Sequence, residues 1–346
     1  MLHVTNGVSV SLDRSGLSGE ILAWVDALHE GPVPAGLGLN DLSRLRAKFL
    51  DYVWPGARSA AEILSNRDRA LGRFAEHEEV TLWFEHDLYD QLQLIQILDW
   101  FCHTGIPACV ARAFLPVSGV STFPGPPVAG VRGVGQAVSP AGIGNPACAT
   151  PRLSLISIDK HLGELTGPQL AGLWPRRHTV SDAELRLAAA AWRAFRAPDP
   201  VGIEELLRSD TSALPFLSGA LLRHLQQFPS VENGLSRSER QILELVEAGT
   251  RDLASLVTAD RAREERIFMG DTTFARYVSG LAECRHPLLA SAGGGYDLTR
   301  TGREVLACRA DHIRLNGINR WLGGVHLVGA EALWRWDERR QRLVAH

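Results

Sequence analysis

The chain has 346 residues, of which 45% are hydrophobic and 22% are charged. This composition is typical of a globular protein, and the length predicts two or more domains. The formal net charge of -3 excludes a general electrostatic attraction to nucleic acids or to membranes.

The cysteines and the lack of long apolar segments narrow the class of protein further. The five cysteines are odd in number and scattered, and no two of them form a CxxC pair. A disulfide framework or a thiolate zinc site is therefore disfavoured, and reduced thiols predict a cytoplasmic location. No run of about 18 apolar residues occurs, and the first residues do not resemble a signal peptide. No membrane partner is expected, and the oligomeric state stays open.

Short apolar segments alternate with helical patterns over residues 1–175. The expected strands lie at residues 2–7, 20–26, 80–84, 106–114 and 152–159. The expected helices lie at residues 40–53, 59–77 and 88–101, with Asn40 or Asp41 as the N-cap of the first. Strands separated by helices favour a parallel sheet that is covered on both faces. We predict a three-layer α/β domain with a mostly parallel sheet.

Residues 115–151 have a different composition from the rest of this domain. They are rich in Gly, Pro, Ala and Val, show no hydrophobic period, and contain one charged residue, Arg132. Few of these side chains could offset the entropy of ordering. The segment is interpreted as a flexible insertion or a long loop, with a functional lid as the alternative.

Residues 176–233 are predicted to form a helical connector. Helical patterns occupy residues 168–177, 181–198, 200–209 and 213–229. Ser181 and Glu184 have the S-x-x-E spacing of a capping box, which marks the beginning of a helix.

Residues 234–346 are predicted to form a winged helix with a β-hairpin tail. Helical patterns at residues 236–249, 252–268 and 271–284 precede a strand, a glycine turn, a strand and a closing helix. Arginines and acidic residues are equally numerous over residues 236–310, and the expected recognition helix offers little positive charge besides Arg276. Because phosphate contacts dominate DNA affinity, a structural or protein-contact role is favoured over DNA binding. The tail is expected to turn near Asp337 to Gln341.

Polar residues stand at the carboxyl ends of four expected strands. They are Thr5, Asn6 and Gly7; Asp26, His29 and Glu30; Glu85, His86, Asp87, Asp90 and Gln91; and Asp159, Lys160 and His161. Ligands of open parallel sheets bind beyond these ends, and buried charges are costly unless they are paired or functional. We therefore predict a shared cleft at this edge of the sheet.

Each group of polar residues also has a structural interpretation. Asp87 can accept backbone N–H bonds at a helix start, and Asp90 suits the positive end of the helix dipole. Asn6 and Gly7 could form only a tight turn. Residues 26–34 could be a rigid surface loop, stiffened by two prolines.

Two chemistries suit the cleft residues. His29 or His86 could exchange a proton near neutral pH beside a carboxylate. Alternatively, Asp26, Glu85 and Asp87 could hold a hard divalent cation, which in turn binds phosphate oxygens. The candidate catalytic residues are Asp26, His29, Glu30, Glu85, His86 and Asp87, and the candidate substrate-binding residues are Thr5, Asn6, Gly7, Asp90 and Gln91.

The motifs that are absent shape the functional hypotheses. No GxSxG, HExxH, GxGxxG or GxxxxGK[ST] motif occurs, so covalent serine catalysis and the known nucleotide fingerprints have no support. The leading hypothesis is an enzyme or ligand-binding protein for a phosphate- or nucleotide-bearing substrate. One alternative is a non-catalytic regulator that senses a ligand and contacts DNA or protein through the winged helix. Another is a structural polar network without catalysis.

The blocks "HEGPVP" and "FEHDLYDQLQ" carry a resemblance to a protein family. With "LHVTNG", "SALPFLSGALLRHLQQFPSVENGLSRSERQIL" and "NGINRWLGGVHL", they resemble bacterial proteins grouped as domain of unknown function 1835. The likeness is strongest over the first hundred residues, and typical members lack the insertion at residues 115–151. The resemblance implies no established activity, but it marks the two blocks as a signature.

Overall fold

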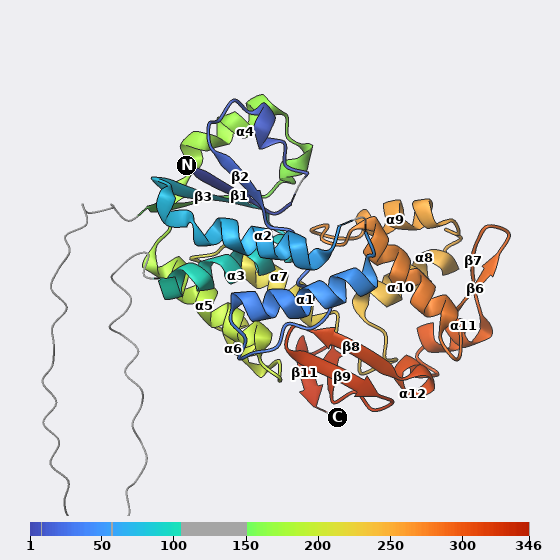
Figure 1. The fold of residues 1–346 in the computed structure, drawn as a ribbon. Coiled ribbons are helices and arrows are strands. Elements are labelled where there is room, and N and C mark those ends of the chain that lie inside the picture. The colour runs from blue at the N-terminus through green and yellow to red at the C-terminus, as the bar shows by residue number, and fades with distance from the viewer. Residues whose placement is uncertain (8, 57, 105–150, 346) are drawn as a thin grey trace, which may run out of the picture.

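A five-stranded sheet forms the centre of the first part of the chain (Figure 1). The computed structural model describes residues 1–7, 9–56, 58–104 and 151–345. The strands are β1 (Leu2–Thr5), β2 (Glu20–Ala23), β3 (Glu79–Phe84), β4 (Arg152–Ser157) and β5 (His178–Thr179). They lie in the order β2-β1-β3-β4-β5, and only β5, at the edge, is antiparallel to its neighbour. The prediction of a mostly parallel α/β sheet is confirmed.

The two faces of the sheet are covered by different elements, because successive strand side chains point to opposite sides. Leu82 and Phe84 of β3 join the main hydrophobic core, whereas Trp83 joins a second cluster with Leu12 and Leu170. The helices on the first side are α1 (Leu39–Val53), α2 (Ala60–Gly72) and α3 (Leu88–Thr104). The second side is covered by the 3-10 helix η1 (Leu12–Arg14) and by α4 (Gly167–Leu173). In Figure 1, α4 lies above the sheet and α2 and α3 lie below it.

The helices that follow the sheet begin largely where the sequence predicts. They are α5 (Asp182–Arg196), α6 (Val201–Leu207) and α7 (Leu217–Leu225). The capping box before α5 is confirmed, because the Ser181 hydroxyl accepts the Glu184 N–H and the Glu184 carboxylate accepts the Ser181 N–H. The short 3-10 helices are η2 (Phe74–Glu76), η3 (Leu162–Glu164) and η4 (Trp174–Arg176). Helix α3 is buried against α5 and α7, as its nearly continuous apolar sequence requires.

The C-terminal part consists of helices and three hairpins. Its helices are α8 (Arg237–Glu247), α9 (Leu253–Arg261), α10 (Asp271–Glu283), α11 (Arg300–Leu306) and α12 (His312–Asn316). The hairpins pair β6 (Leu289–Ala292) with β7 (Gly295–Leu298), β8 (Ile318–Leu322) with β9 (Val325–Gly329), and β10 (Trp334–Asp337) with β11 (Arg342–Ala345). The order of α8 to α11 and the turn of the last hairpin match the prediction, whereas the hairpin of β8 and β9 was not predicted.

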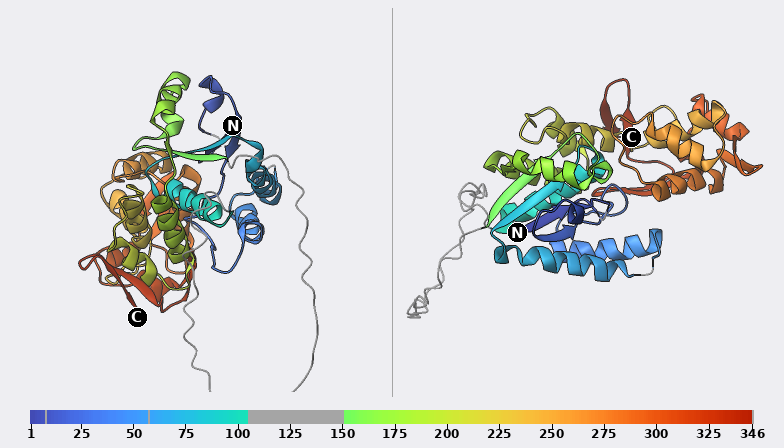
Figure 2. Two further views of the ribbon diagram at one scale, coloured as in Figure 1. Left: turned by 90° about the vertical axis from the view of Figure 1, so that its left-hand side faces the viewer. Right: turned by 90° about the horizontal axis from the view of Figure 1, so that it is seen from above.

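The main hydrophobic core extends from the sheet to the C-terminal helices and hairpins. The same cluster of buried side chains contains Leu2 and Val4 of β1, Leu221 of α7, Val278 of α10 and Leu343 of β11. The two views of Figure 2 show the C-terminal helices packed beside the sheet and its helices. The sheet and the C-terminal elements therefore stabilise one another.

Some element boundaries differ from the predictions. Helix α1 begins at Leu39 with Gly38 as its N-cap, so the expected caps Asn40 and Asp41 are wrong. Strand β2 ends at Ala23, three residues before the expected end. The expected strand at residues 106–114 and nearly all of the expected insertion lie outside the described residues. Within the described residues, no helix is both long and apolar enough to cross a membrane.

Candidate functional site

The ends of three neighbouring strands line one cavity of about 580 Å³. Asn6 follows β1, Glu85 follows β3, and His161 lies shortly after β4. Because β1, β3 and β4 are adjacent in the sheet, these residues converge although they are far apart in the sequence. Val25, Ala27 and His29, from the loop after β2, contribute to the same wall. The sheet order thus provides a shared cleft at the predicted edge.

Glu85 lies at the centre of the hydrogen bonds in this cavity. Its Oε1 accepts the Leu162 backbone N–H at 2.6 Å and the Asn6 side-chain amide at 3.0 Å. Its Oε2 lies 2.8 Å from Nδ1 of His161. The carboxylate is 4% exposed, and these contacts from β1 and from the chain after β4 fix its orientation.

Asp87 and Asp90 bring two further carboxyl groups into the cluster. Asp87 accepts the Asp90 backbone N–H at 3.2 Å, as expected for a residue that begins a helix. Asp90 accepts the Glu85 backbone N–H at 2.7 Å and the Asn6 amide at 2.8 Å. Burial, followed by the charge of Glu85, raises the pKa of Asp87 to about 7. Burial and the charge of Asp87 likewise raise the pKa of Asp90 well above its usual range.

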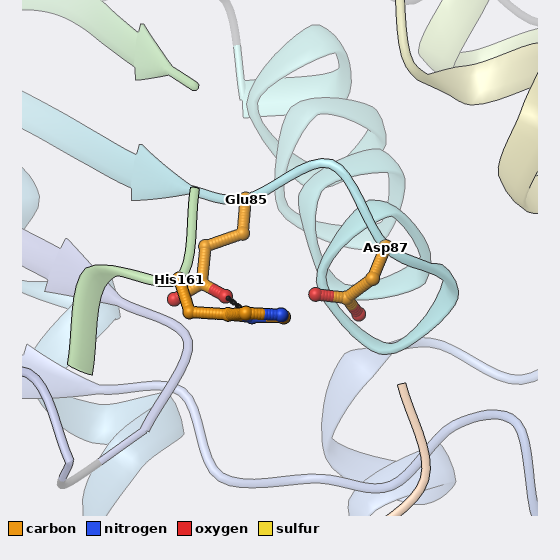
Figure 3. A group of neighbouring side chains, drawn as sticks. All are labelled: Glu85, Asp87 and His161. Carbon is orange, nitrogen blue, oxygen red and sulfur yellow. Dashed lines mark hydrogen bonds and ion pairs between the residues drawn. The ribbon is translucent and has the colours of Figure 1, made fainter. Parts of the chain in front are cut away.

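His161 completes a group that could hold a cation. One oxygen each of Glu85 and Asp87 and one ring nitrogen of His161 lie within 4.8 Å of one another. Figure 3 shows the ring of His161 between the two carboxylates, with its second nitrogen toward Asp87. The hydrogen bond that His161 donates to the Glu85 carboxylate raises the pKa of His161. A histidine oriented by a carboxylate on one nitrogen is a common arrangement for metal ligation through the other.

His29 is a buried histidine that lines the same cavity. It is 4% exposed, and neither ring nitrogen has a hydrogen-bond partner among the described residues. Burial, followed by the charge of Arg46, lowers the pKa of His29 to about 3, so the ring is neutral. Its edges contact Tyr89 and Phe268. A buried polar group without a partner is costly, and a ligand in the cavity would supply one.

Asp26 is placed away from this cluster, which corrects the expected cation site of Asp26, Glu85 and Asp87. Both of its carboxylate oxygens accept hydrogen bonds from Arg46 of α1, the shortest at 2.7 Å. Arg46 also donates to the backbone carbonyls of Ala27 and Glu30. Asp26 therefore holds the loop after β2 in place, and His161 replaces it in the group that could hold a cation.

Glu30 and His86 also lie outside the group of Glu85, Asp87 and His161. Glu30 accepts a hydrogen bond of 2.8 Å from the Tyr277 hydroxyl of α10, and burial raises its pKa. The ring of His86 lies 5.4 Å from that of His161, measured between centroids. Burial, followed by the charge of His161, lowers the pKa of His86. Glu30 thus connects the two parts of the chain, and His86 lies beside the cluster.

The remaining expected residues support the backbone around the cavity. The Thr5 hydroxyl donates to the Gly7 carbonyl at 2.9 Å, which stabilises the turn after β1. Gln91 donates to the Glu85 carbonyl at 2.6 Å, which joins the first turn of α3 to the end of β3. Gly7 itself lines the cavity. The structure therefore gives Thr5 and Gln91 local partners and leaves Gly7 facing the cavity.

The C-terminal part supplies a wall of the cavity that the sequence did not indicate. Residues 267–270 and Thr273, between α9 and the first turn of α10, line it together with Arg261. Arg261 forms an ion pair of 2.7 Å with Asp271. No local motif marks these residues, because their role depends on packing against residues that lie about 100 or more positions earlier in the sequence.

A second buried histidine, His224 of α7, gives a testable pH dependence. It is 1% exposed between Phe195 and Phe228, and neither ring nitrogen has a described hydrogen-bond partner. Burial lowers its pKa from 6.5 to about 3, so the unfolded chain binds the extra proton between these pH values. Stability is therefore lost as the pH falls below 6.5, by about 1.4 kcal/mol per pH unit.

His224→Leu is expected to remove this dependence. As the pH falls from 7.5 to 5.5, the wild type should lose about 1.4 kcal/mol more of its free energy of unfolding than the variant does. Urea denaturation of both proteins at the two pH values measures the change. If the free energies of unfolding of the two proteins differ by the same amount at both pH values, His224 is not a neutral buried residue.

The charges around the cavity indicate which ligands it accepts. Glu85, Asp87, Asp90 and Glu164 are acidic, whereas Arg261 is the single lysine or arginine among the described residues of the wall. Such a cavity favours a cation, or a proton shared among the carboxyl groups. A scan against protein-family models and a search of curated proteins gave no match to the chain.

Proposed function

We propose that the chain is an enzyme that acts on a phosphate- or nucleotide-bearing small molecule with the help of a divalent cation. The observation that carries this proposal is the convergence of Glu85, Asp87 and His161, whose ligand atoms lie within 4.8 Å of one another in the cavity. Carboxylate oxygens and a histidine nitrogen suit Mn²⁺, Mg²⁺ or Zn²⁺. His29, whose ring nitrogens have no hydrogen-bond partner in the described part of the chain, is an independent sign that this cavity receives a ligand.

Electrostatics explains why a cation belongs to this proposal. The acidic residues of the wall would repel a phosphate group that entered alone. A divalent cation would neutralise them and would polarise a phosphate oxygen. Burial and the charge of Glu85 raise the pKa of Asp87 to about 7, and a bound cation would lower it, so that Asp87 would ligate as the carboxylate. Neutral His29 and the backbone at Asn6 and Gly7 would contact the substrate.

The position of the cavity in the sheet also supports a ligand site. The chain places β2 on one side of β1 and β3 on the other, so the strand order reverses at β1. In Rossmann-like sheets, ligands bind in the crevice at such a reversal. We therefore propose a Rossmann-like arrangement for this part of the chain. We further propose, from the blocks "HEGPVP" and "FEHDLYDQLQ", that the chain belongs to the family grouped as domain of unknown function 1835. We also propose a cytoplasmic location.

Cation binding tests this proposal directly. Isothermal titration and thermal unfolding with Mn²⁺, Mg²⁺ and Zn²⁺ should show binding by the wild type. A cation at about 100 times its Kd adds about 2.7 kcal/mol to the free energy of unfolding. His161→Ala should lose this response, whereas His103→Ala, a control whose exposed side chain lies at the end of α3, should keep it. A wild type that binds none of the three cations would refute the cation-dependent function.

A second candidate is a ligand-sensing regulator, and one observation favours it. Residues 267–270 and Thr273 line the same cavity as Glu85, so a bound ligand would touch both parts of the chain. Helix α10, the expected recognition helix, buries Phe274, Tyr277 and Val278 inside the protein, and Arg276 lies over Trp54. This placement supports internal coupling or protein contact rather than DNA binding through α10. If Asp87→Asn leaves ligand affinity within about 10-fold and abolishes turnover, the enzyme is favoured over the regulator and over a purely structural network.

A further inference from the structure

An apolar groove lies beside the acidic cluster. This groove has a volume of about 710 Å³ and is lined by Trp54, Ile63, Leu64 and Tyr89, with Thr272 and Thr273 on the opposite wall. It lies between α1, α2 and the first turn of α10. Its volume is in the range that small-molecule ligands occupy.

The groove adjoins the cavity that contains Glu85. The two share a wall of Val25, Ala27, Tyr89, Gly270 and Thr273. At their boundary, Arg261 lines the cavity and Asp271 lines the groove, and the two side chains form an ion pair of 2.7 Å. A single molecule could therefore place a charged end in the cavity and an apolar end in the groove.

The groove offers the side chains on which nucleic-acid bases stack. Trp54 is partly exposed, and the guanidinium of Arg276 lies over its ring at 5.7 Å from the centroid. Arg58 lines the same groove. Aromatic rings and guanidinium planes are the usual stacking partners of bases, and Arg58 supplies a guanidinium in this groove, whereas Arg276 lines a separate cavity. An acyl chain would make no use of Arg58.

We propose that the substrate is a nucleoside phosphate whose base lies in the apolar groove against Trp54. Its phosphate would lie in the cavity at Glu85, Asp87 and His161, beside Arg261. This inference rests on the proposed function and narrows its substrate class from phosphate-bearing compounds to those with a planar base. It also makes Trp54 and Ile63 specificity-determining residues that do not touch the reacting atoms.

Binding measurements with matched ligands test the inference. The adenosine, guanosine, cytidine and uridine monophosphates are compared with ribose 5-phosphate by isothermal titration in the presence of Mg²⁺. At least one nucleotide should bind roughly 10-fold or more tightly than ribose 5-phosphate, because stacking adds affinity only where a base is present. In Trp54→Ala, the affinity for the nucleotide should fall to that for ribose 5-phosphate. The affinity for ribose 5-phosphate itself should stay within about 2-fold of the wild-type value.

Two further variants separate the groove from general effects on folding. Ile63→Ser changes a partly exposed groove residue. It should lower the ratio of the nucleotide affinity to the ribose 5-phosphate affinity. Tyr52→Ala removes an aromatic ring from the same helix as Leu50 of the groove, but Tyr52 is 85% exposed and outside the groove, so the ratio should stay unchanged.

The outcomes distinguish this inference from the proposed function. Nucleotides that bind no more tightly than ribose 5-phosphate, or an octyl phosphate that binds more tightly than all four nucleotides, would overturn the base in the groove. If the nucleotide preference is lost in Trp54→Ala but does not need Mg²⁺, the base site in the groove is supported and the cation-dependent function is refuted. If Trp54→Ala keeps the nucleotide preference and this preference still needs Mg²⁺, the base site in the groove is refuted and the cation-dependent function is supported.

Discussion

Glu85→Gln is expected to lower the affinity for a divalent cation by about 10- to 100-fold while the protein stays folded. The glutamine oxygen can still accept the hydrogen bonds from Asn6 and Leu162. Its amide group would then face Nδ1 of His161 and donate to it, which moves the ring hydrogen to the other nitrogen. That nitrogen, which points toward Asp87, would no longer be able to bind a cation. Isothermal titration with Mn²⁺ measures the loss.

A matched control and a second readout make this test specific. Glu164→Gln makes the same chemical change at an exposed position of the same cavity, and it should leave cation affinity within about 2-fold. Because the hydrogen bond to the Glu85 carboxylate raises the pKa of His161, that pKa should fall in Glu85→Gln, as followed by NMR titration. Unchanged cation affinity together with a lowered pKa of His161 would show that His161 is not a ligand.

Arg46→Met is expected to lower the free energy of unfolding by about 3–5 kcal/mol, because it leaves the Asp26 carboxylate buried without its partner. The two side chains are 0% and 1% exposed, and Arg46 also ties the carbonyls of Ala27 and Glu30 to α1. Urea denaturation measures the change. The loop after β2 carries His29, so ligand affinity should fall as well.

The neighbouring Arg44 provides the control for this variant. Arg44 lies on the same helix and pairs with Asp41, but its side chain is 76% exposed. Arg44→Met should therefore change the free energy of unfolding by less than about 0.5 kcal/mol. Adding Asp26→Leu to Arg46→Met should recover part of the loss, because it removes the unpaired charge. Equal urea midpoints for the two single variants would contradict the structural role given to the buried pair.

Local sequence patterns predicted the elements well because their causes are local. The capping box of Ser181 and Glu184 lies within three residues, and the structure shows both of its hydrogen bonds at the start of α5. The apolar run of β3 is buried on both faces, as predicted. The expected caps of α1 were wrong because the helix begins one residue before Asn40, at Leu39, where Gly38 supplies an extended N-cap without a side chain.

From the sequence, the candidate site could be predicted only for residues that lie directly after a strand. Glu85 and Asp87 follow β3 directly, and their place at the carboxyl edge of a parallel sheet is a rule of topology. The role of Asp26 could not be foreseen, because its partner Arg46 is 20 residues away on a helix whose rotation is set by packing. His161 stood among the residues at the strand ends, but its contact with Glu85 requires β3 and β4 to be neighbours.

The main hydrophobic core, which joins the two ends of the described chain, has a consequence for the order in which the protein can fold during synthesis. Leu2 and Leu343 belong to the same cluster, and the Leu343 N–H donates to the Glu204 carboxylate of α6. A nascent chain cannot close this core until residue 343 has left the ribosome exit tunnel. Until then, the apolar strands β1, β3 and β4 and helix α3 lack part of their cover, and such surfaces promote aggregation. These strands and α3 are therefore the surfaces that a chaperone would be expected to cover during translation.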